Sequence, residues 1–348
     1  MSSRRLPSSQ PRAVSIEDVA SAASVSTATV SRVLNNPGLV ASATAKRVQA
    51  AIDELEYRPN ILAKGLSTRK TGVLGIALPD IFGEFYSELL RGADSEARAS
   101  GYHLLVSSEA RIGDGGHAES TLAFGLIDGL AVMITEPDAR ILPEAARSKV
   151  PVVVLDAETQ GQRFDSVVVD NAVGTREAVH HLLESVGPAE CLFVGGPREN
   201  FDTASRAAAF TAALAERGHR VRAEQLSFGT YTAEWGLKWA TERLASRGTG
   251  RSCFGVLAGN DEIAYGVMQA CQDAGVSIPG ELRLIGCDDS RLASLVRPRL
   301  SSVRVPAAEI GAAAVRLLVR RVKEPNAAPT HLTLPTKLVI RESSVWRG

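Results

Sequence analysis

The sequence predicts two folding units of different class: a small all-α unit at the N-terminus and a larger α/β unit of two parallel-sheet subdomains. Three observations support this. The chain has 348 residues, more than a single core usually holds. Short helical patterns fill the first part of the chain, and beyond it apolar runs alternate with helical stretches. We expect a flexible tail at 1–14, a helical unit at 15–58, a hinge at 59–71 and the α/β unit at 72–348.

Charge is divided unevenly between these units. The formal net charge of the chain is zero, but residues 1–72 carry ten basic and five acidic side chains, so the remainder is anionic. A cationic unit attached to an anionic one suits a protein of which only the first meets a phosphate backbone. An ordinary uneven surface gives the same count, so the function has to be argued from motifs.

The sequence also indicates the cellular compartment of the protein. No apolar run approaches the roughly 18 residues of a membrane span, and Met1–Arg12 has no apolar stretch of the kind that a signal peptide requires. We therefore expect a cytoplasmic protein with no membrane partner. The cysteines are scattered singly, without the spacing of a metal or redox site, and we expect them to be reduced. They are Cys191, Cys253, Cys271 and Cys287.

Two short helices are predicted near the N-terminus. Ser15 and Asp18 form a capping-box pattern before a first helix, whose apolar residues recur at helical spacing. Ser24 and Val25 make a turn, and Ser26 can cap a second helix. The face of the second helix that points away from the core is small and polar, and it comprises Thr27, Ala28, Ser31, Arg32 and Asn35.

This arrangement indicates a DNA-binding unit. Two short helices joined by a turn fit the major groove when the second presents such a face, and Arg32 can reach a guanine edge with two hydrogen bonds. Ser42 can cap a third helix, which Pro59 is expected to stop. Helices this short need one another for a core, so residues 15–58 should form one domain.

Three motifs in this segment, D-V-A, V-S-x-x-T-V-S-R-V-L-N and Y-x-P-N, carry a family resemblance. The segment resembles the headpiece of the lactose-repressor (LacI) family of transcriptional regulators. The resemblance implies that Thr27, Ala28 and Arg32 read bases, and that backbone-contacting or neighbouring positions are held by Ser26, Ser31 and Asn35. One departure is Ser24, where the family usually has glycine. Serine tolerates positive φ poorly, so we expect a strained or adjusted turn.

The resemblance continues into residues 60–67, which match the family's hinge helix. That helix forms when two subunits meet on DNA, and its leucine wedge enters the minor groove. The resemblance places Asn60 and Leu66 at DNA-contacting positions, with Leu66 as the wedge. From composition alone Leu66 would be a core residue, and the register with Pro59 favours the wedge. Gly65 lowers helix propensity by about 1 kcal/mol relative to alanine.

The remaining sequence predicts a doubly wound core. Apolar runs such as 73–78, 152–155 and 191–194 alternate with candidate helices such as 85–99 and 261–274. There are more predicted strands than one open sheet usually holds, so we expect two similar halves around a cleft. The chain is expected to cross between these halves near 170, 300 and 331. The stretches "GNDEIAYGVM", "IPGELRLIGCDDS" and "LVIRES" resemble the periplasmic-binding-protein-like core of the same family.

Ligands of open α/β sheets bind outside the carboxyl ends of strands, where this sequence carries polar and aromatic residues. The resemblance implies that Arg206 and Asp288 grip ligand hydroxyls or a carboxylate and that Tyr231 stacks on the ligand. Each alone would also suit an ordinary surface or strand-end residue. The predicted effector-binding set is Asp80, Phe85, Tyr86, Arg206, Tyr231, Asn260 and Asp288.

Neither the Asp288-Asp289 pair nor the His180-His181 pair has the surrounding groups that metal or acid-base chemistry needs, so we expect no metal, no cofactor and no enzyme. A transport receptor shares the core fold but would have a signal sequence and no headpiece. We expect a regulator, by family default a sugar-responsive repressor, although some relatives sense nucleobases. The resemblance implies a homodimer on a pseudo-palindromic operator with a central CG step. Residues 346–348 end the chain without the leucine-rich tail of tetrameric relatives.

Overall fold

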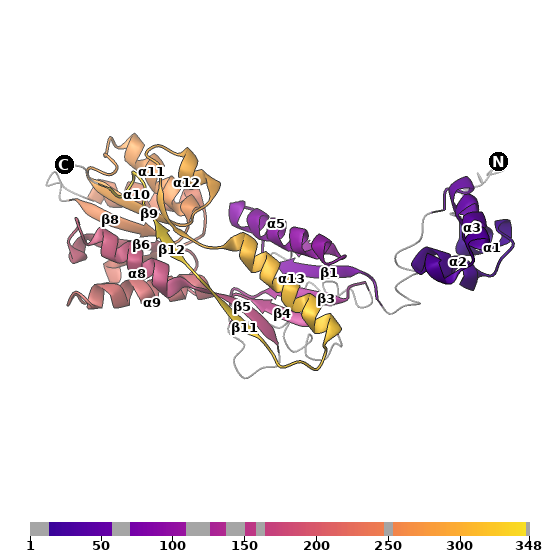
Figure 1. Cartoon of the computed structure of the whole chain (residues 1–348). Coiled ribbons are helices and arrows are strands. Elements are labelled where there is room, and N and C mark those ends of the chain that lie inside the picture. The colour runs from indigo at the N-terminus through magenta and orange to yellow at the C-terminus, as the bar shows by residue number, and fades with distance from the viewer. Residues whose placement is uncertain are drawn as a thin grey trace, which may run out of the picture. The chain divides into compact units, whose positions relative to one another are not determined.

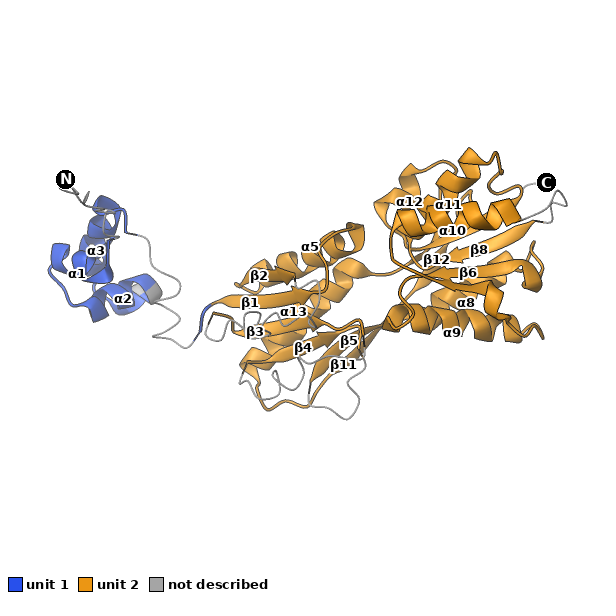
Figure 2. Ribbon diagram, turned by 180° about the vertical axis from the view of Figure 1, so that it is seen from behind, with its two compact units in different colours: residues 1–71 blue, residues 72–348 orange. Residues whose placement is uncertain are grey.

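The computed structural model divides into two compact units, Met1–Thr71 and Gly72–Gly348, which Figure 2 colours separately. Among the residues that it describes, no helix is long and apolar enough to cross a bilayer. The four cysteines are free thiols, as predicted, and three of them are buried. The described residues are 14–57, 70–108, 126–136, 150–157, 164–246 and 253–345.

Unit 1 is a cluster of short helices around one small core. Its elements are α1 (Ile16–Ala22), α2 (Thr27–Asn35), a 3-10 turn η1 (Pro37–Leu39) and α3 (Ser42–Glu54). The core is aliphatic, so three helices that are each too short to be stable alone stabilise one another. The buried side chains are Val19, Ala20, Ala23, Val30, Val33, Val48, Ala51 and Ile52.

The ends of these helices test the predicted caps. Ser15 and Asp18 form the predicted capping box: the Ser15 amide donates to the Asp18 carboxylate at 2.7 Å, and the Asp18 amide to Ser15 Oγ at 3.3 Å. Ser26 caps α2 by accepting from the Thr29 amide. The cap at Ser42 was predicted wrongly, because Ser42 is already helical and Ala41 stands at the N-cap without a side-chain bond.

The end of α3 also differs from the prediction. The helix ends at Glu54, and Glu56 adopts φ 49°, a left-handed conformation that turns the chain away from the helix axis. Pro59, which was expected to stop this helix, lies outside the described residues. The turn between α1 and α2 is strained as expected, because Ser24 has φ 51°, a region that costs a non-glycine residue roughly 1–2 kcal/mol.

Unit 2 contains two six-stranded sheets, each the centre of one lobe. The first lobe has the order β2-β1-β3-β4-β5-β11 and the second has β7-β6-β8-β9-β10-β12. These are the same order, so the predicted pair of similar halves is confirmed. All pairings are parallel except that of β10 with β12, which is antiparallel.

The strands of the first lobe are β1 (Val73–Leu78), β2 (His103–Ser108), β3 (Gly129–Met133), β4 (Val152–Leu155), β5 (Asp165–Asp170) and β11 (His331–Pro335). Those of the second lobe are β6 (Cys191–Gly195), β7 (Leu226–Phe228), β8 (Phe254–Ala258), β9 (Leu282–Asp288), β10 (Ser301–Arg304) and β12 (Lys337–Val339). The central strands β3, β4, β6 and β8 are buried at every position, as parallel strands covered by helices require.

Helices cover these sheets in layers. In the second lobe, α8 (Asn171–Leu182) and α9 (Phe201–Ala215) lie on one face, and α10 (Ala233–Ser246) and α11 (Asp261–Asp273) lie on the other (Figures 1 and 2). The short α12 (Arg291–Leu295) follows β9. In the first lobe, α5 (Glu84–Ala99) packs against α13 (Ala307–Lys323).

The pair α5 and α13 touches backbone to backbone. A Cβ added to Gly92 would lie 1.9 Å from the carbonyl oxygen of Ala308, and one added to Gly311 would lie 2.0 Å from that of Leu89. Only glycine fits at either position, so the two helices pack in direct backbone contact. The chain passes between lobes three times: from β5 to α8, from β10 to α13, and at Thr336 between β11 and β12.

A buried ion pair ties the end of α13 to the sheet of the first lobe. Arg321 donates to both carboxylate oxygens of Asp165 at 2.8 and 2.9 Å, and the Thr330 amide donates to the same carboxylate at 2.7 Å. The two side chains are 12% and 2% exposed. The Asp165 carboxylate therefore has little access to water and depends on these donors.

We predict that Arg321→Ala lowers the free energy of unfolding by about 3–5 kcal/mol, because it leaves a buried carboxylate without its cation. Urea unfolding followed by circular dichroism measures this. Arg98→Ala is the matched control: it removes an arginine that is 76% exposed and pairs with Asp94 one helical turn away, and it should leave the free energy nearly unchanged. Equal effects of the two substitutions would contradict the prediction.

Candidate functional site

A cleft of about 350 Å³ lies between the two lobes of unit 2, at the carboxyl ends of their strands. All seven residues of the predicted effector-binding set line it. Asp80 follows β1 and Asp288 ends β9, while Tyr231 and Asn260 follow β7 and β8. The cleft is therefore where parallel topology places a ligand site.

Arg206 is the centre of a buried hydrogen-bond network at the floor of the cleft. Its side chain, 5% exposed, extends from α9 and donates to three groups: the Asn171 amide oxygen at 2.8 Å, the Gly259 carbonyl at 2.7 Å and the Asp202 carboxylate at 3.2 Å. Asn171 in turn donates to Asp202 at 2.7 Å. The guanidinium thus joins α8, α9 and the loop after β8, so Arg206 has a structural role as well as a place in the cleft.

The aromatic residues stand on both lobes. Tyr231 packs its ring against Gly196, where an added Cβ would lie 2.6 Å from ring carbons. Its hydroxyl lies 2.6 Å from Thr203 Oγ1 and donates to Asn200 at 3.0 Å. Phe85 and Tyr86, from the first turn of α5, meet edge to face with ring centroids 5.3 Å apart. Such surfaces suit the apolar face of a ring-shaped ligand.

Asn260 lines the cleft but its amide already has partners. The oxygen accepts from the Ile263 amide at 2.8 Å and caps α11, and the nitrogen donates to the Tyr231 carbonyl at 3.3 Å. Its position therefore follows from the fold of the second lobe, and little of its hydrogen-bonding capacity faces a ligand.

Two adjacent aspartates at the end of β9 have unusual backbone geometry. Asp288 has φ 103° and Asp289 has φ 55°, and strain of this kind concentrates at functional sites. Asp289 turns inward to form ion pairs with Arg304 and Arg341, each at 2.6 Å. Asp288 remains in the cleft, where burial raises the pKa of its carboxyl, an effect that Arg206 opposes.

The sequence did not single out Asp156 and Asp202, which also line the cleft. Burial, and then the charge of Asp202, raises the pKa of Asp156, while Arg206 lowers it. Asp156 stands directly after the buried run 152–155, so its place at a strand end was a usable signal. Asp202 lies one helical turn before Arg206, the spacing of an intrahelical pair.

One carboxylate connects the lobes directly. Glu84, at the start of α5 in the first lobe, accepts from the backbone amides of Arg291 and Leu292 in the second lobe at 2.7 and 3.3 Å. These amides belong to the first turn of α12, where a helix has unpaired donors. The contact holds the lobes together beside the cleft.

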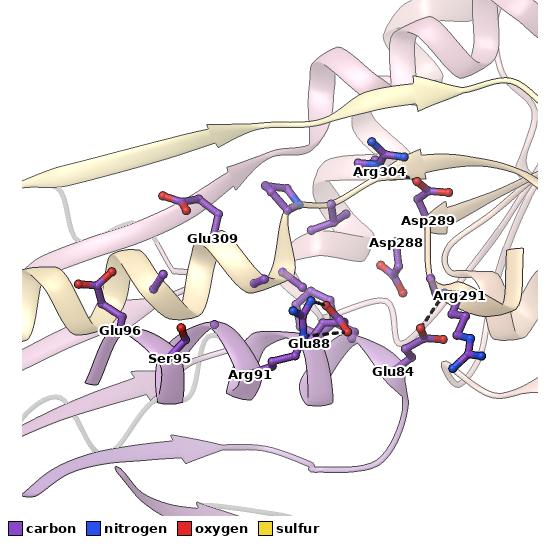
Figure 3. A pocket seen from close by; sticks show the side chains of 18 residues that line it. Glu84, Glu88, Arg91, Ser95, Glu96, Asp288, Asp289, Arg291, Arg304 and Glu309 are labelled. Atoms are coloured by element: carbon purple, nitrogen blue, oxygen red, sulfur yellow. Dashed lines mark hydrogen bonds and ion pairs between the residues drawn. The ribbon is translucent and has the colours of Figure 1, made fainter. Parts of the chain in front are cut away.

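A second hollow of about 760 Å³ lies where α5, the first turn of α13 and the loop after β9 meet (Figure 3). Four of its charged side chains pair with one another: Arg91 with Glu88, and Arg304 with Asp289. Asp288 and Glu84 line both hollows. The junction between lobes is therefore accessible from two sides.

The predicted DNA-reading face lies on α2 of unit 1. Thr27, Ala28 and Arg32 are exposed, as is Ser26, while Ser31 is half-buried. Arg32 makes no hydrogen bond or ion pair with any described residue, so its guanidinium is available. The side chain of Asn35 is not described, and Asn60 and Leu66 lie outside the described residues.

Sequence and structure comparisons fit these two regions. Residues 15–60 match the family model "Bacterial regulatory proteins, lacI family" and residues 179–344 match "Periplasmic binding protein-like domain". Catabolite control protein A of Priestia megaterium is 34% identical over 333 residues, which cover 95% of this chain and 99% of that protein. The chain belongs to the lacI family. Its relatives are transcriptional regulators, so the prediction of a regulator, and not an enzyme, is confirmed.

Solved structures of lacI-family proteins match the whole chain. The Lac repressor dimer bound to operator and the anti-inducer ONPF has a TM-score of 0.84 at 25% identity and covers 96% of this chain and 100% of that one. The transcriptional regulator CelR in complex with cellobiose has a TM-score of 0.71 at 26% identity, with coverage of 95% and 99%. The predicted fold class is confirmed.

The adjacent histidines His180 and His181 both have hydrogen-bond partners within the protein. His180 bonds to Glu216 and His181 to Ser344, both at 2.9 Å. Within the described ranges, no group of three His, Cys, Asp or Glu side chains is placed to hold a metal ion. Both histidines therefore pack α8 against its neighbours.

A further buried carboxylate, that of Asp261, belongs to the lining of the cleft. Asp261 accepts from Ser302 Oγ at 2.6 Å and from the amide and hydroxyl of Ser290 at 2.7 and 2.8 Å. Burial raises its pKa to about 7, although these hydrogen bonds act in the opposite direction. Gly286 leaves room for the carboxylate, because a Cβ there would lie 2.2 Å from Asp261 Oδ1.

This shift predicts a pH dependence of stability. The pKa of an unfolded aspartate is about 3.9, below the native value, so the unfolded state binds fewer protons in between. The contribution of Asp261 to stability is thus present near pH 4 and lost as the pH rises to about 7. Asp261→Asn removes this loss, so the unfolding free energy of the variant minus that of the parent should increase by roughly 3 kcal/mol between pH 4 and 7.5.

Chemical unfolding at a series of pH values measures that difference. Asp273→Asn changes an exposed residue of the same helix and serves as the control. Its unfolding free energy should differ from that of the parent by the same amount at every pH. A difference for Asp261→Asn that does not change with pH would show that the native carboxyl titrates normally.

Proposed function

We propose that this lacI-family protein is a cytoplasmic repressor whose operator affinity is controlled by a carbohydrate bound in the cleft between the lobes. One observation carries the proposal: the same chain has an exposed polar face on α2, at the positions proposed to read bases, and a cleft lined by all seven residues of the predicted effector-binding set. Lac repressor bound to operator and CelR bound to cellobiose support this assignment as whole-chain relatives.

The cleft links ligand binding to the relative orientation of the lobes. Its lining comes from both lobes, so a ligand that contacts both favours one orientation. The α5 and α13 pair transmits that orientation as one body, and β1 of the first lobe directly follows the hinge segment. A ligand shifts such an equilibrium only by its differential affinity for the two states, typically 1–3 kcal/mol.

We further propose a homodimer that binds a pseudo-palindrome of roughly 14–20 base pairs with a central CG step. Two-fold symmetry of the protein requires the palindrome, and residues 60–67 are proposed as a hinge helix at its centre. Selection of binding sequences from random DNA by the full chain, followed by light scattering of the complex, tests both parts. A stable tetramer, or selected sites without two-fold symmetry, would contradict them.

Arg32→Ala should weaken operator binding by about 1–3 kcal/mol and relax the base preference at one symmetric pair of positions, because it removes a bidentate contact to guanine. Fluorescence anisotropy with the selected operator and its single-base variants measures both effects. Arg98→Ala, which removes an exposed arginine from unit 2, is the control. Full affinity with unchanged base preference would show that Arg32 reads no base.

Leu66→Ala should weaken operator binding and reduce the bend of the DNA, because the proposed wedge acts only on a kinked base step. Circular-permutation gel shifts report the bend, and calorimetry reports effector binding, which should not change. An unaltered bend together with unaltered affinity would show that Leu66 does not act as a wedge in the DNA.

Asp288→Asn should abolish the response to effector while leaving operator binding intact, because no DNA contact changes. Arg206→Lys should reduce the response and also lower stability, since Arg206 holds three segments by hydrogen bonds that lysine cannot reproduce. Operator titrations with and without a sugar found by thermal-shift screening measure the response. A response retained in both variants would place the effector elsewhere, and a nucleobase that outcompetes sugars in the screen would replace the carbohydrate assignment.

A further inference from the structure

The turn at the end of β9 is strained at two successive residues. Asp288 and Asp289 both have positive φ, 103° and 55°, although neither is a glycine, and such a backbone persists only where its surroundings hold it in place. Figure 3 shows their side chains pointing in different directions, Asp289 toward Arg304 and Asp288 away from it. The orientation of Asp288 in the cleft therefore depends on a turn that needs support.

Asp289 receives that support on the side away from the cleft. Its side chain is 3% exposed, its amide donates to Ser302 Oγ at 3.0 Å, and Oδ2 accepts from Arg304 Nε at 2.6 Å. The other oxygen, Oδ1, is buried and accepts no hydrogen bond from any residue that the structure describes. Arg341 Nη2 lies 2.6 Å from this oxygen, so the charge of Arg341 compensates it.

The two arginines that pair with Asp289 are not equivalent. The side chain of Arg304 is 47% exposed, whereas that of Arg341 is 18% exposed. Water screens an exposed ion pair strongly and a buried one weakly. Loss of Arg341 would therefore leave a buried carboxylate poorly compensated, which is costly in a protein interior.

Arg341 is itself held in place by contacts that do not involve Asp289. Its amide donates to Ser301 Oγ at 2.7 Å, and its carbonyl accepts from the same hydroxyl at 3.1 Å. Two residues further on, the Ser343 hydroxyl donates to the Leu284 carbonyl at 2.6 Å, and both serines are fully buried. Because these bonds do not use the guanidinium, the backbone after β12 keeps its path when the Arg341 side chain is removed.

We infer that Arg341 is a positioning residue of the effector site, an inference that rests on the proposed effector function. Its ion pair with Asp289 holds the strained turn and thereby directs Asp288 into the cleft, although Arg341 does not line the cleft. Without Arg341, Asp289 turns toward water, the turn relaxes to negative φ, and Asp288 leaves its position. A side chain beyond β12 thus determines the geometry of a site that it does not touch.

Crystal structures of the parent and of Arg341→Ala, each without effector, test the positioning directly. In the variant, residues 288 and 289 should lose positive φ, and the Asp288 carboxylate should move by more than about 0.5 Å, the tolerance of a preorganised site. Arg299→Ala is the matched control, because Arg299 is exposed and pairs with Glu342, the neighbour of Arg341. It should leave the turn as it is. An unchanged turn in Arg341→Ala overturns the inference, whatever the effector is.

Isothermal titration of the full chain with D-ribose, D-glucose and cellobiose measures the consequence for binding. For a sugar that the parent binds, Arg341→Ala should raise Kd at least about tenfold, and Arg341→Lys, which keeps the charge, less than about threefold. Arg299→Ala should not change Kd. Operator affinity without sugar should be the same in all these variants. An unchanged Kd in Arg341→Ala, or an equal loss in Arg299→Ala, contradicts the inference.

A double-mutant cycle separates positioning from a general loss of stability. Asparagine tolerates a left-handed turn and carries no charge, so Asp289→Asn removes the need for Arg341. Adding Arg341→Ala to Asp289→Asn should therefore change Kd by less than about twofold, and a loss of about tenfold contradicts the inference. This pair also decides the matter if Arg341→Ala alone does not fold.

Failure of the proposed function has a different signature. A parent protein that binds none of the three sugars at millimolar concentration counts against the carbohydrate effector. The turn in the crystal structures then still shows whether Arg341 positions Asp288.

Discussion

The hydrogen bonds of Arg206 fix the floor of the cleft, and the other features of unit 2 depend on them. One guanidinium joins α8, α9 and the loop after β8, three segments of the second lobe that are far apart in the chain. Its charge also opposes the effect of burial on Asp156 and Asp288, whose pKa values burial raises.

Direct contacts within and between the lobes shape the cleft. Within the first lobe, glycine at positions 92 and 311 brings α5 and α13 into backbone contact. Between lobes, Glu84 caps the start of α12, and Asp156 and Asp288 approach from opposite lobes. A ligand that adds hydrogen bonds across this junction favours the orientation of the lobes in which those bonds form.

The two lobes and the capping box at Ser15 could be predicted from the sequence, because each follows from local periodicity or capping pattern. The seven predicted effector residues, which the family resemblance supplied, line one cleft. The sequence did not predict contacts between residues that are far apart in the chain. The partners of Glu84 are more than two hundred residues distant. Strands as short as β7 and β12 have three residues each, too few for a period to show. Ser42 was misjudged as a cap because Ala41, which has no side-chain acceptor, holds the N-cap position instead.

The three passages of the chain between lobes limit how this protein can be rebuilt. Each lobe ends its sheet with a strand from the last part of the chain, β11 in one and β12 in the other, only Thr336 apart. A single cut or a single splice therefore cannot release or replace a lobe. A chimera that borrows the second lobe of a relative needs three junctions, one at each passage, and the third has to be placed within a residue or two of Thr336. Circular permutation at a surface loop of one lobe, which keeps all three passages, is the less disruptive route.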